Sequence, residues 1–208
     1  FWVIGSGMAE RYHQRFWEMV PRPERTTFEV MTEGWCGFNI AGPASRRALQ
    51  RLTDASLATA DMPFMRSAWI EVAGVTCLAL RVSFTGDLGW ELHCATADQP
   101  KLYAALLDAA KAEGGGPVGS RALMALRVEK GYGSWGREYS PEYWPQEVGL
   151  DRLVKMDKDF LNKDAYLQVK DNASREELRL VHVQEVDSAD AAGGEPIFLP
   201  DGTPVGRV

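Results

Sequence analysis

The sequence predicts an α+β fold, and three observations support that prediction. The 208 residues are 45% hydrophobic and 25% charged, which is typical of a folded soluble protein and excludes a disordered or low-complexity chain. Two apolar runs, 66–72 and 75–84, flank Ala73-Gly74 and are typical of a β-hairpin. Amphipathic helical patterns follow without a regular strand–helix–strand repeat, which favours antiparallel sheets with packed helices.

The other elements follow from residue periodicity along the chain. Strand patterns cover 1–5, two short runs within 27–40, then 89–94 and 178–186. Helical patterns cover 8–20, a segment opened by Gly42-Pro43, a segment capped by Asp98, then 120–130 and 161–170. Pro21 stops the first helix, because proline cannot continue it. In the helix after Asp98, the apolar residues recur at helical spacing and predict a buried face: Leu102, Ala105, Leu106 and Ala109.

The end of the chain is typical of a second domain that has just begun. Residues 171–174 form a predicted linker. Two short apolar runs around Pro200-Asp201-Gly202 then predict a β-hairpin. We therefore divide the chain into residues 1–170 and 171–208. Because it begins and ends inside strand patterns, we expect it to be a fragment of a larger protein.

Composition excludes several classes of function. No apolar run approaches the roughly 18 residues of a membrane-spanning helix. The formal charge of −6, without a basic stripe, argues against a nucleic-acid-binding protein. Cys36, Cys77 and Cys94 are odd in number, far apart and without a Cys-x-x-Cys pair, so neither a disulfide framework nor a metal site is expected. This cysteine usage favours a reducing compartment: the cytoplasm, or the mitochondrial matrix of a eukaryote.

The strand pattern at 89–94 contains the first candidate site. Alternation places Glu91 and His93 on one face and an apolar set, Trp90, Leu92 and Cys94, on the other. Gly89 permits close approach of another chain segment or a ligand. The acid and the imidazole are interpreted either as part of a binding site or as a solvated sheet face.

A second candidate is Arg121, near the start of the helix at 120–130. Its helical neighbours are apolar, and a buried guanidinium requires an anionic partner from the protein or from a ligand. The alternative is an arginine that reaches into solvent from the helix start. Four aromatic residues crowd the following loop, where they either wall a flat heterocyclic ligand or close the core: Trp135, Tyr139, Tyr143 and Trp144.

Three ordered motifs carry a family resemblance across essentially the whole chain. They are Phe84-Thr-Gly-Asp-Leu-Gly-Trp-Glu91, Arg121-Ala-Leu-Met-Ala-Leu-Arg127-Val-Glu129-Lys-Gly131 with Trp135-Gly-Arg-Glu138, and Ser140-Pro-Glu-Tyr-Trp-Pro-Gln-Glu-Val-Gly-Leu150 followed by Val154-Lys-Met-Asp-Lys158. The sequence thereby resembles the glycine-cleavage T-protein family of folate-dependent aminomethyltransferases. It is more similar still to the C-terminal folate domains of dimethylglycine and sarcosine dehydrogenases.

The resemblance implies a T-protein-like folate-binding fold, of which residues 171–208 form the first strands of a C-terminal β-barrel. It implies that Glu91 binds the pterin ring of tetrahydrofolate and that Arg121 contacts folate. Phe84 matches a position near the reacting pterin that is usually tyrosine in the relatives, and Trp135 matches a wall of the site. The family's catalytic aspartate corresponds to a position upstream of Phe1, so no catalytic residue is assigned and the fragment alone is expected to be inactive.

The function expected from the resemblance is one-carbon transfer to tetrahydrofolate in a flavin-linked N-methylamine dehydrogenase. A methylated amine is then the substrate, and FAD is held by a separate N-terminal domain of the parent polypeptide. Two alternatives remain open. One is a stand-alone aminomethyltransferase or folate-dependent demethylase. The other is a folate-binding scaffold without transfer activity, with which the phenylalanine at position 84 is compatible.

Overall fold

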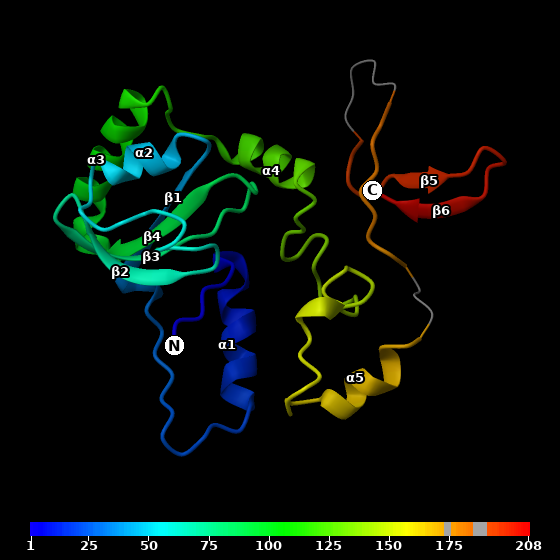
Figure 1. Cartoon of the computed structure of the whole chain (residues 1–208). Coiled ribbons are helices and arrows are strands. Elements are labelled where there is room, and N and C mark those ends of the chain that lie inside the picture. Colours follow the sequence, from blue (N-terminus) through cyan, green and yellow to red (C-terminus); the bar gives the residue numbers. More distant parts are fainter. Residues whose placement is uncertain (173–175, 185–190) are drawn as a thin grey trace. The chain divides into compact units, whose positions relative to one another are not determined.

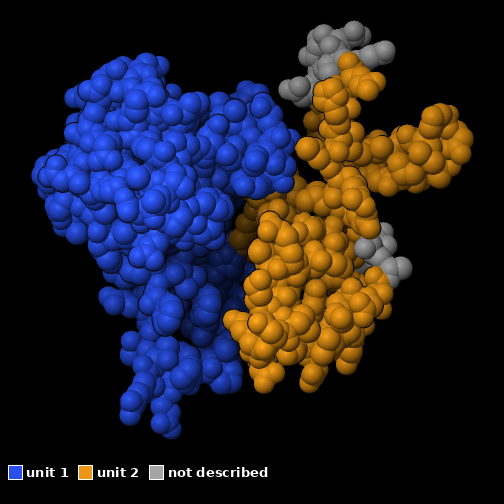
Figure 2. Space-filling view, in the orientation of Figure 1, with its two compact units in different colours: residues 1–132 blue, residues 133–208 orange. Residues whose placement is uncertain are grey.

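The computed structural model (Figure 1) describes residues 1–172, 176–184 and 191–208. The chain forms two compact units, Phe1–Tyr132 and Gly133–Val208, which we call unit 1 and unit 2 (Figure 2). The predicted domain boundary between residues 170 and 171 stays a prediction. None of the helices in the described ranges combines the length and the apolar character that crossing a bilayer requires.

A four-stranded antiparallel sheet forms the centre of unit 1, with strand order β1-β4-β3-β2 (Figure 1). The strands are β1 (Trp35–Ala41), β2 (Ser67–Val72), β3 (Val75–Leu80) and β4 (Gly89–Ala95). Ala73 and Gly74 join β2 to β3 with positive φ values of 51° and 69°, as a tight hairpin turn requires. The α+β class, the predicted hairpin and the predicted strand at 89–94 are therefore confirmed, and β4 is an interior strand.

Two helices pack on one face of this sheet and create the core (Figure 1). They are α2 (Ser45–Gln50) and α3 (Gln99–Ala112). The helix α3 buries Leu102, Leu106 and Ala109, three of the four residues in the predicted apolar stripe. From the sheet, the side chains of Trp90, Leu92 and Cys94 are fully buried in the same cluster. The predicted division of β4 into a core face and an opposite face is thus confirmed.

Two more helices belong to unit 1. The helix α1 (Glu10–Met19) follows a 3-10 turn at Gly7–Ala9, and α4 (Ser120–Glu129) ends at Lys130. Further 3-10 turns cover Thr32–Gly34 and Thr96–Asp98. Arg127 of α4 is only 3% exposed, and its Nη1 donates a hydrogen bond to the Tyr132 carbonyl at 3.0 Å. This arginine therefore supports the end of the helix.

Unit 2 contains α5 (Lys163–Val169), a 3-10 turn at Asp151–Leu153, and a hairpin of β5 (Pro196–Phe198) and β6 (Pro204–Arg207). The predicted helix at 161–170 and the predicted C-terminal hairpin are thereby confirmed. A buried carboxylate, Glu147, accepts a hydrogen bond from the backbone N–H of Trp144 at 2.9 Å. The Arg207 guanidinium donates to the Tyr143 hydroxyl at 2.8 Å, which ties the hairpin to the aromatic loop.

Three strand predictions are wrong, for one common reason. Residues 1–5 are not a strand, because their backbone pairs with no neighbouring strand. Trp2 instead packs through its side chain, and its ring centroid lies 4.7 Å from that of Trp35. The first strand expected within 27–40 is absent, since Phe28 stacks on Trp17 of α1 at 6.3 Å. Residues 178–184 form no strand, and residues 185–186 and residues 173–174 of the predicted linker lie outside the described residues. An apolar alternating run without a pairing partner does not form a strand.

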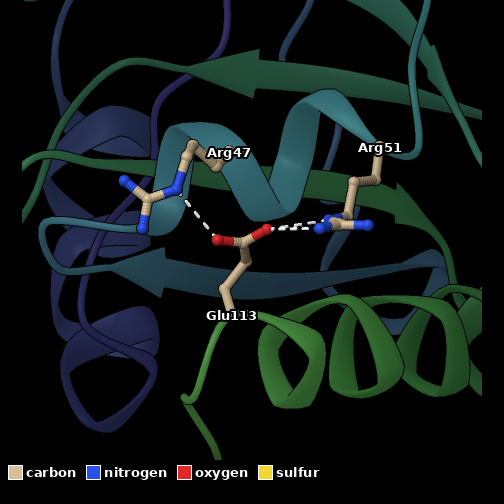
Figure 3. Close-up of polar contacts among 3 residues, drawn as sticks. All are labelled: Arg47, Arg51 and Glu113. Atoms are coloured by element: carbon tan, nitrogen blue, oxygen red, sulfur yellow. Dashed lines mark hydrogen bonds and ion pairs between the residues drawn. The ribbon is translucent and has the colours of Figure 1, made fainter.

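The first residue after α3 joins this helix to α2 through a pair of arginines (Figure 3). The Glu113 carboxylate accepts hydrogen bonds from Arg47 Nε at 2.9 Å and from Arg51 Nε at 2.8 Å. These hydrogen bonds from the two guanidinium groups lower the pKa of Glu113. The ionised form of the carboxylate therefore stabilises the contact between the two helices.

We expect the contacts of Glu113 with Arg47 and Arg51 to make the stability of unit 1 depend on pH in the acidic range. Because its pKa in the folded chain is lowered, Glu113 contributes stability above the ordinary glutamate pKa of 4.5, and that contribution is lost as pH falls through the lowered value. In chemical denaturation from pH 7 to pH 3, Glu113→Gln should lower stability at neutral pH and lose less on acidification than wild type. Glu18→Gln, at an exposed position of α1, is the control. Parallel pH profiles for wild type and Glu113→Gln would contradict the prediction.

Candidate functional site

The face of the sheet opposite α2 and α3, here called the second face, carries the candidate residues on β4. Strand alternation and register assign its members: Trp35, Gly37 and Asn39 of β1, Glu91 and His93 of β4, Leu78 and Leu80 of β3, and Trp69 and Glu71 of β2. The three tryptophan rings of Trp2, Trp35 and Trp69 meet edge to face, with centroids 4.7–6.0 Å apart. The second face therefore combines two acids, Glu91 on β4 and Glu71 on β2, and one imidazole with an aromatic cluster.

Glu91 and His93 lie next to each other on this face, two residues apart on the interior strand. The His93 Nε2 and the Glu91 Oε2 are 3.5 Å apart, and the Glu91 side chain is 30% exposed. The register partners of Glu91 are Asn39 and Leu80, neither of which is charged. The buried His93 Nε2 has no hydrogen-bond partner among the described residues. The carboxylate is thus accessible, is fixed on a rigid strand and has its acceptor capacity open to a ligand.

The position of the His93 ring depends on a glycine on the neighbouring strand. Gly37 is the register partner of His93, and a Cβ at position 37 would lie 3.1 Å from His93 Nδ1 and 3.2 Å from Cε1. The Nδ1–Cε1 edge of the imidazole therefore occupies the space that a side chain at position 37 would fill. Close approach, and not an unusual φ, is the reason for glycine at this position.

We expect Gly37→Ala to displace the imidazole without changing either site side chain. Overpacking of this kind costs on the order of 1 kcal/mol of unfolding free energy. The His93 imidazole signals in an NMR spectrum should shift, and they are readily assigned because the chain has 3 histidines. Gly34→Ala is the matched control, since nothing lies within 4 Å of a Cβ there. An unchanged His93 spectrum in Gly37→Ala would contradict this geometry.

Phe84 lies in the loop that joins β3 to β4 and is half-buried. This loop is braced by Thr85, whose hydroxyl lies 3.1 Å from that of Ser83 and donates to the Asp87 carboxylate at 3.1 Å. It borders a cavity of about 360 Å³ whose lining includes Arg81, Asp87, Lys130 and Tyr132. The Lys130 stem packs on Gly86, where a Cβ would come within 2.4 Å of it. The structure thus places Phe84 and Glu91 on the same β3–β4 hairpin. The end of α4 packs against the loop of this hairpin.

The other two predicted site residues are Arg121 in unit 1 and Trp135 in unit 2. Arg121 lies exposed in the first turn of α4 and has no hydrogen-bond or ion-pair partner among the described residues. Of the two interpretations of the sequence, the arginine that reaches out from the helix start is the one that fits unit 1. Trp135 belongs to unit 2, where it is half-buried and forms a bridge with Tyr139. Its place in a site with Glu91 stays a prediction.

One arrangement of the cysteines is not evident from the sequence. Cys36 and Cys94 are register partners on β1 and β4, and their Sγ atoms are 3.5 Å apart. Continuing the β3–β4 register by one residue places Cys77 opposite Cys94 on the other side. The three thiols form a row across three strands of the core face, which only the non-local pairing of β1 with β4 reveals. Within the described residues, no group of three potential ligands is suited to a metal ion.

These features support binding more than covalent catalysis. Burial raises the pKa of the Cys94 thiol to about 12 and that of Cys77 to about 11, so the thiolate of each is scarce at neutral pH and each is a poor nucleophile there. The Glu91 carboxylate is able to accept two parallel N–H bonds from an amidine-like edge of a heterocycle. The second face is therefore suited to a planar ligand that presents two parallel N–H donors on one edge.

Comparison with known proteins gives a consistent family. A family model described as the GCVT N-terminal domain matches residues 1–158. The chain is 36% identical over 201 residues to a Homo sapiens protein named "Dimethylglycine dehydrogenase, mitochondrial", covering 94% of this chain and 23% of that protein. It is 36% identical over 173 residues to the Homo sapiens "Sarcosine dehydrogenase, mitochondrial", covering 82% of this chain and 18% of that protein.

A bacterial relative is shorter. The chain is 34% identical over 162 residues to an "Aminomethyltransferase" of Anoxybacillus flavithermus, covering 77% of this chain and 44% of that protein. The chain therefore spans less than half the length of each of the three relatives, and about a fifth of the two dehydrogenases.

Proposed function

The chain belongs to the GCVT N-terminal domain family, a family of folate-binding domains, and on that premise we propose that it binds tetrahydrofolate with Glu91 as the pterin anchor. The observation that carries the proposal is the position of this carboxylate. It is accessible on a face that also carries an aromatic cluster, and it is fixed on an interior strand. The amide and amino N–H groups of a pterin present the donor edge that such a carboxylate binds.

The residues around Glu91 would then orient the ligand. Phe84 would offer an apolar wall close to the start of β4, and His93, whose Nε2 lies 3.5 Å from Glu91 Oε2, would border the carboxylate. Arg121, whose guanidinium is exposed, would pair with a carboxylate of the folate tail. Trp135 would supply a second flat wall. When bound, tetrahydrofolate supplies the nucleophilic nitrogen that accepts a one-carbon unit.

We further propose that the parent protein is a flavin-linked N-methylamine dehydrogenase of the dimethylglycine or sarcosine type. The support for that choice is the 36% identity to the human dimethylglycine dehydrogenase over 94% of this chain, while the matches to the rat protein of that name and to the Anoxybacillus flavithermus aminomethyltransferase each cover 77%. In such a protein, FAD in a separate N-terminal domain would oxidise a methylated amine. The folate-binding domain formed by the present chain would then present tetrahydrofolate to the oxidised product. An aspartate upstream of Phe1 would act in the transfer step.

The choice of parent also sets the expected compartment. The two human dehydrogenases carry the word mitochondrial in their names. We propose the mitochondrial matrix for a eukaryotic source of this chain and the cytoplasm for a bacterial one.

Calorimetric titration of tetrahydrofolate into the chain, and into the parent protein, tests the proposal. We expect saturable binding with one site, and release of the one-carbon product only by the parent when a methylated amine is added. Binding without any transfer by the parent would support the scaffold alternative in place of the dehydrogenase. Absence of binding to both proteins would overturn the assignment of the pterin site.

The stand-alone aminomethyltransferase remains the second candidate, and the same experiment separates it from the first. It shares the folate site, and its support is the 34% identity to the bacterial enzyme over 162 residues. A parent protein that binds tetrahydrofolate, contains no flavin and transfers the one-carbon unit without oxidising an amine would favour it.

A further inference from the structure

Two of the three core-face cysteines, Cys36 and Cys94, are placed so that a disulfide bond could join them. Cys36 and Cys94 lie directly opposite each other on adjacent antiparallel strands, with their Sγ atoms 3.5 Å apart. Opposing residues in such a ladder have Cα atoms about 4.5–5.5 Å apart, within the range of about 4.4–6.8 Å that disulfides span. A small side-chain rotation therefore suffices to join the two sulfur atoms, without a change of register.

The two thiols differ in access, which suggests an order of events. Cys36 is half-buried on the edge strand β1, whereas Cys94 is fully buried on the interior strand β4. A small oxidant in solvent therefore reaches Cys36 first. Cys94 then has only to react with the sulfur beside it, where proximity replaces collision from solution.

We propose that Cys36 and Cys94 are a modification site, which small disulfides such as glutathione disulfide convert reversibly into an intrachain disulfide that links β1 to β4. In the first step the Cys36 thiolate attacks one sulfur of the small disulfide, forming a mixed disulfide and releasing one thiol. In the second, the Cys94 thiolate attacks Cys36 Sγ and releases the second thiol. Two protein thiols are oxidised and one small disulfide is reduced to two thiols, so atoms and electrons balance.

The environment of Cys94 determines how fast the disulfide closes and does not determine whether it forms. Its raised pKa, about 12, keeps the thiolate scarce at neutral pH. Closure is therefore slow near pH 7 and becomes about tenfold faster for each pH unit, as long as the thiolate is the minor form. The product closes a loop between residues 58 positions apart, which restricts the unfolded chain more than the folded one.

The test is oxidation of the folded chain in a glutathione redox buffer, followed by mass spectrometry of the intact protein and of its peptides. We expect the loss of two hydrogen atoms and one cross-linked peptide pair that contains Cys36 and Cys94. The thermal midpoint should rise by on the order of 10 °C and return after reduction. The oxidation rate should increase with pH as described above.

Two variants identify the partners. Cys77→Ala should still form the bond, whereas Cys36→Ala, at the half-buried position, should keep both remaining thiols. A chain that retains three free thiols in the oxidising buffer at pH 8.5 would overturn the proposal. A cross-link between Cys77 and Cys94 in the wild-type chain would overturn it as well. Neither readout uses folate, so the result is independent of the proposed function.

Discussion

Replacing Trp90 by alanine should cost about 3–5 kcal/mol of unfolding free energy, the largest loss expected from one substitution in unit 1. Trp90 is 0% exposed and is the largest fully buried side chain of the described residues. Folded domains retain only about 5–15 kcal/mol of stability, so this loss would leave a measurable unfolded population at room temperature. Chemical denaturation followed by circular dichroism would measure it.

The size of the effect follows from what surrounds the indole. Its Nε1 donates to the Met62 sulfur at 3.3 Å, and the guanidinium carbons of Arg46 and Arg81 lie 5.8 and 5.9 Å from the ring. Arg81 also donates to the Met62 carbonyl at 2.8 Å, which holds this segment over the ring. Truncation would therefore remove a hydrogen bond and two cation–π contacts in addition to leaving a cavity.

Trp69→Ala is the matched control on the same sheet. Trp69 is 52% exposed on the second face, with ring contacts to Trp2 and Trp35 at 6.0 and 5.8 Å. Its loss should cost about 1 kcal/mol, because most of the ring surface is already in water. Equal losses for the two variants would contradict the assignment of Trp90 to the core face.

Glu91→Ala should weaken the binding of tetrahydrofolate by about 1–3 kcal/mol, or about five- to 150-fold in the dissociation constant. The variant would leave the donor edge of the pterin without a partner on the protein, which is the main cost of removing one side of a buried hydrogen-bonded pair. The stability of the chain should change little, since the carboxylate is 30% exposed and its neighbour His93 has no hydrogen bond to lose within the described residues. Titration calorimetry would measure the affinity.

Two further variants make the result specific. Glu71→Ala removes the same charge from the same face on the edge strand β2, where Glu71 accepts a hydrogen bond from Thr76. It should bind tetrahydrofolate as wild type does. Glu91→Gln keeps one acceptor oxygen but replaces the second by a donor, so its affinity should lie between those of wild type and Glu91→Ala. Equal weakening by Glu71→Ala and Glu91→Ala would point to a general effect of charge and not to a pterin site.

Local patterns predicted the parts of the fold that depend on a single element. The alternation in β4 separated Trp90, Leu92 and Cys94 from Glu91 and His93, because the side-chain period of a strand is fixed by its backbone. The buried stripe of α3 was equally readable, since Leu102, Leu106 and Ala109 recur at helical spacing. The position of Glu91 on an accessible face is therefore accounted for by its sequence neighbours.

Pairings between distant segments were not predictable in the same way. The contact of Cys36 with Cys94 depends on the register of β1 against β4, which no local pattern specifies. The apolar run at 1–5 resembles a strand in composition, yet Trp2 is held by other aromatic rings. The apolar neighbours of Arg121 left open whether its guanidinium is buried with a partner or reaches solvent, and the side chain is exposed. In each case the conformation depends on which residues from distant parts of the sequence lie nearby in the folded chain.

The strand order also has a consequence for how unit 1 folds. The turn at Ala73-Gly74 brings β2 and β3 together at almost no cost in chain entropy, and β4 follows β3 after a short loop. By contrast, β1 must find β4 across a separation of 58 residues at Cys36 and Cys94. Long-range closures of this kind form late. We therefore expect β1 to dock last, on a three-stranded intermediate that already presents Glu91 and His93 and lacks only Gly37 and Asn39 beside them.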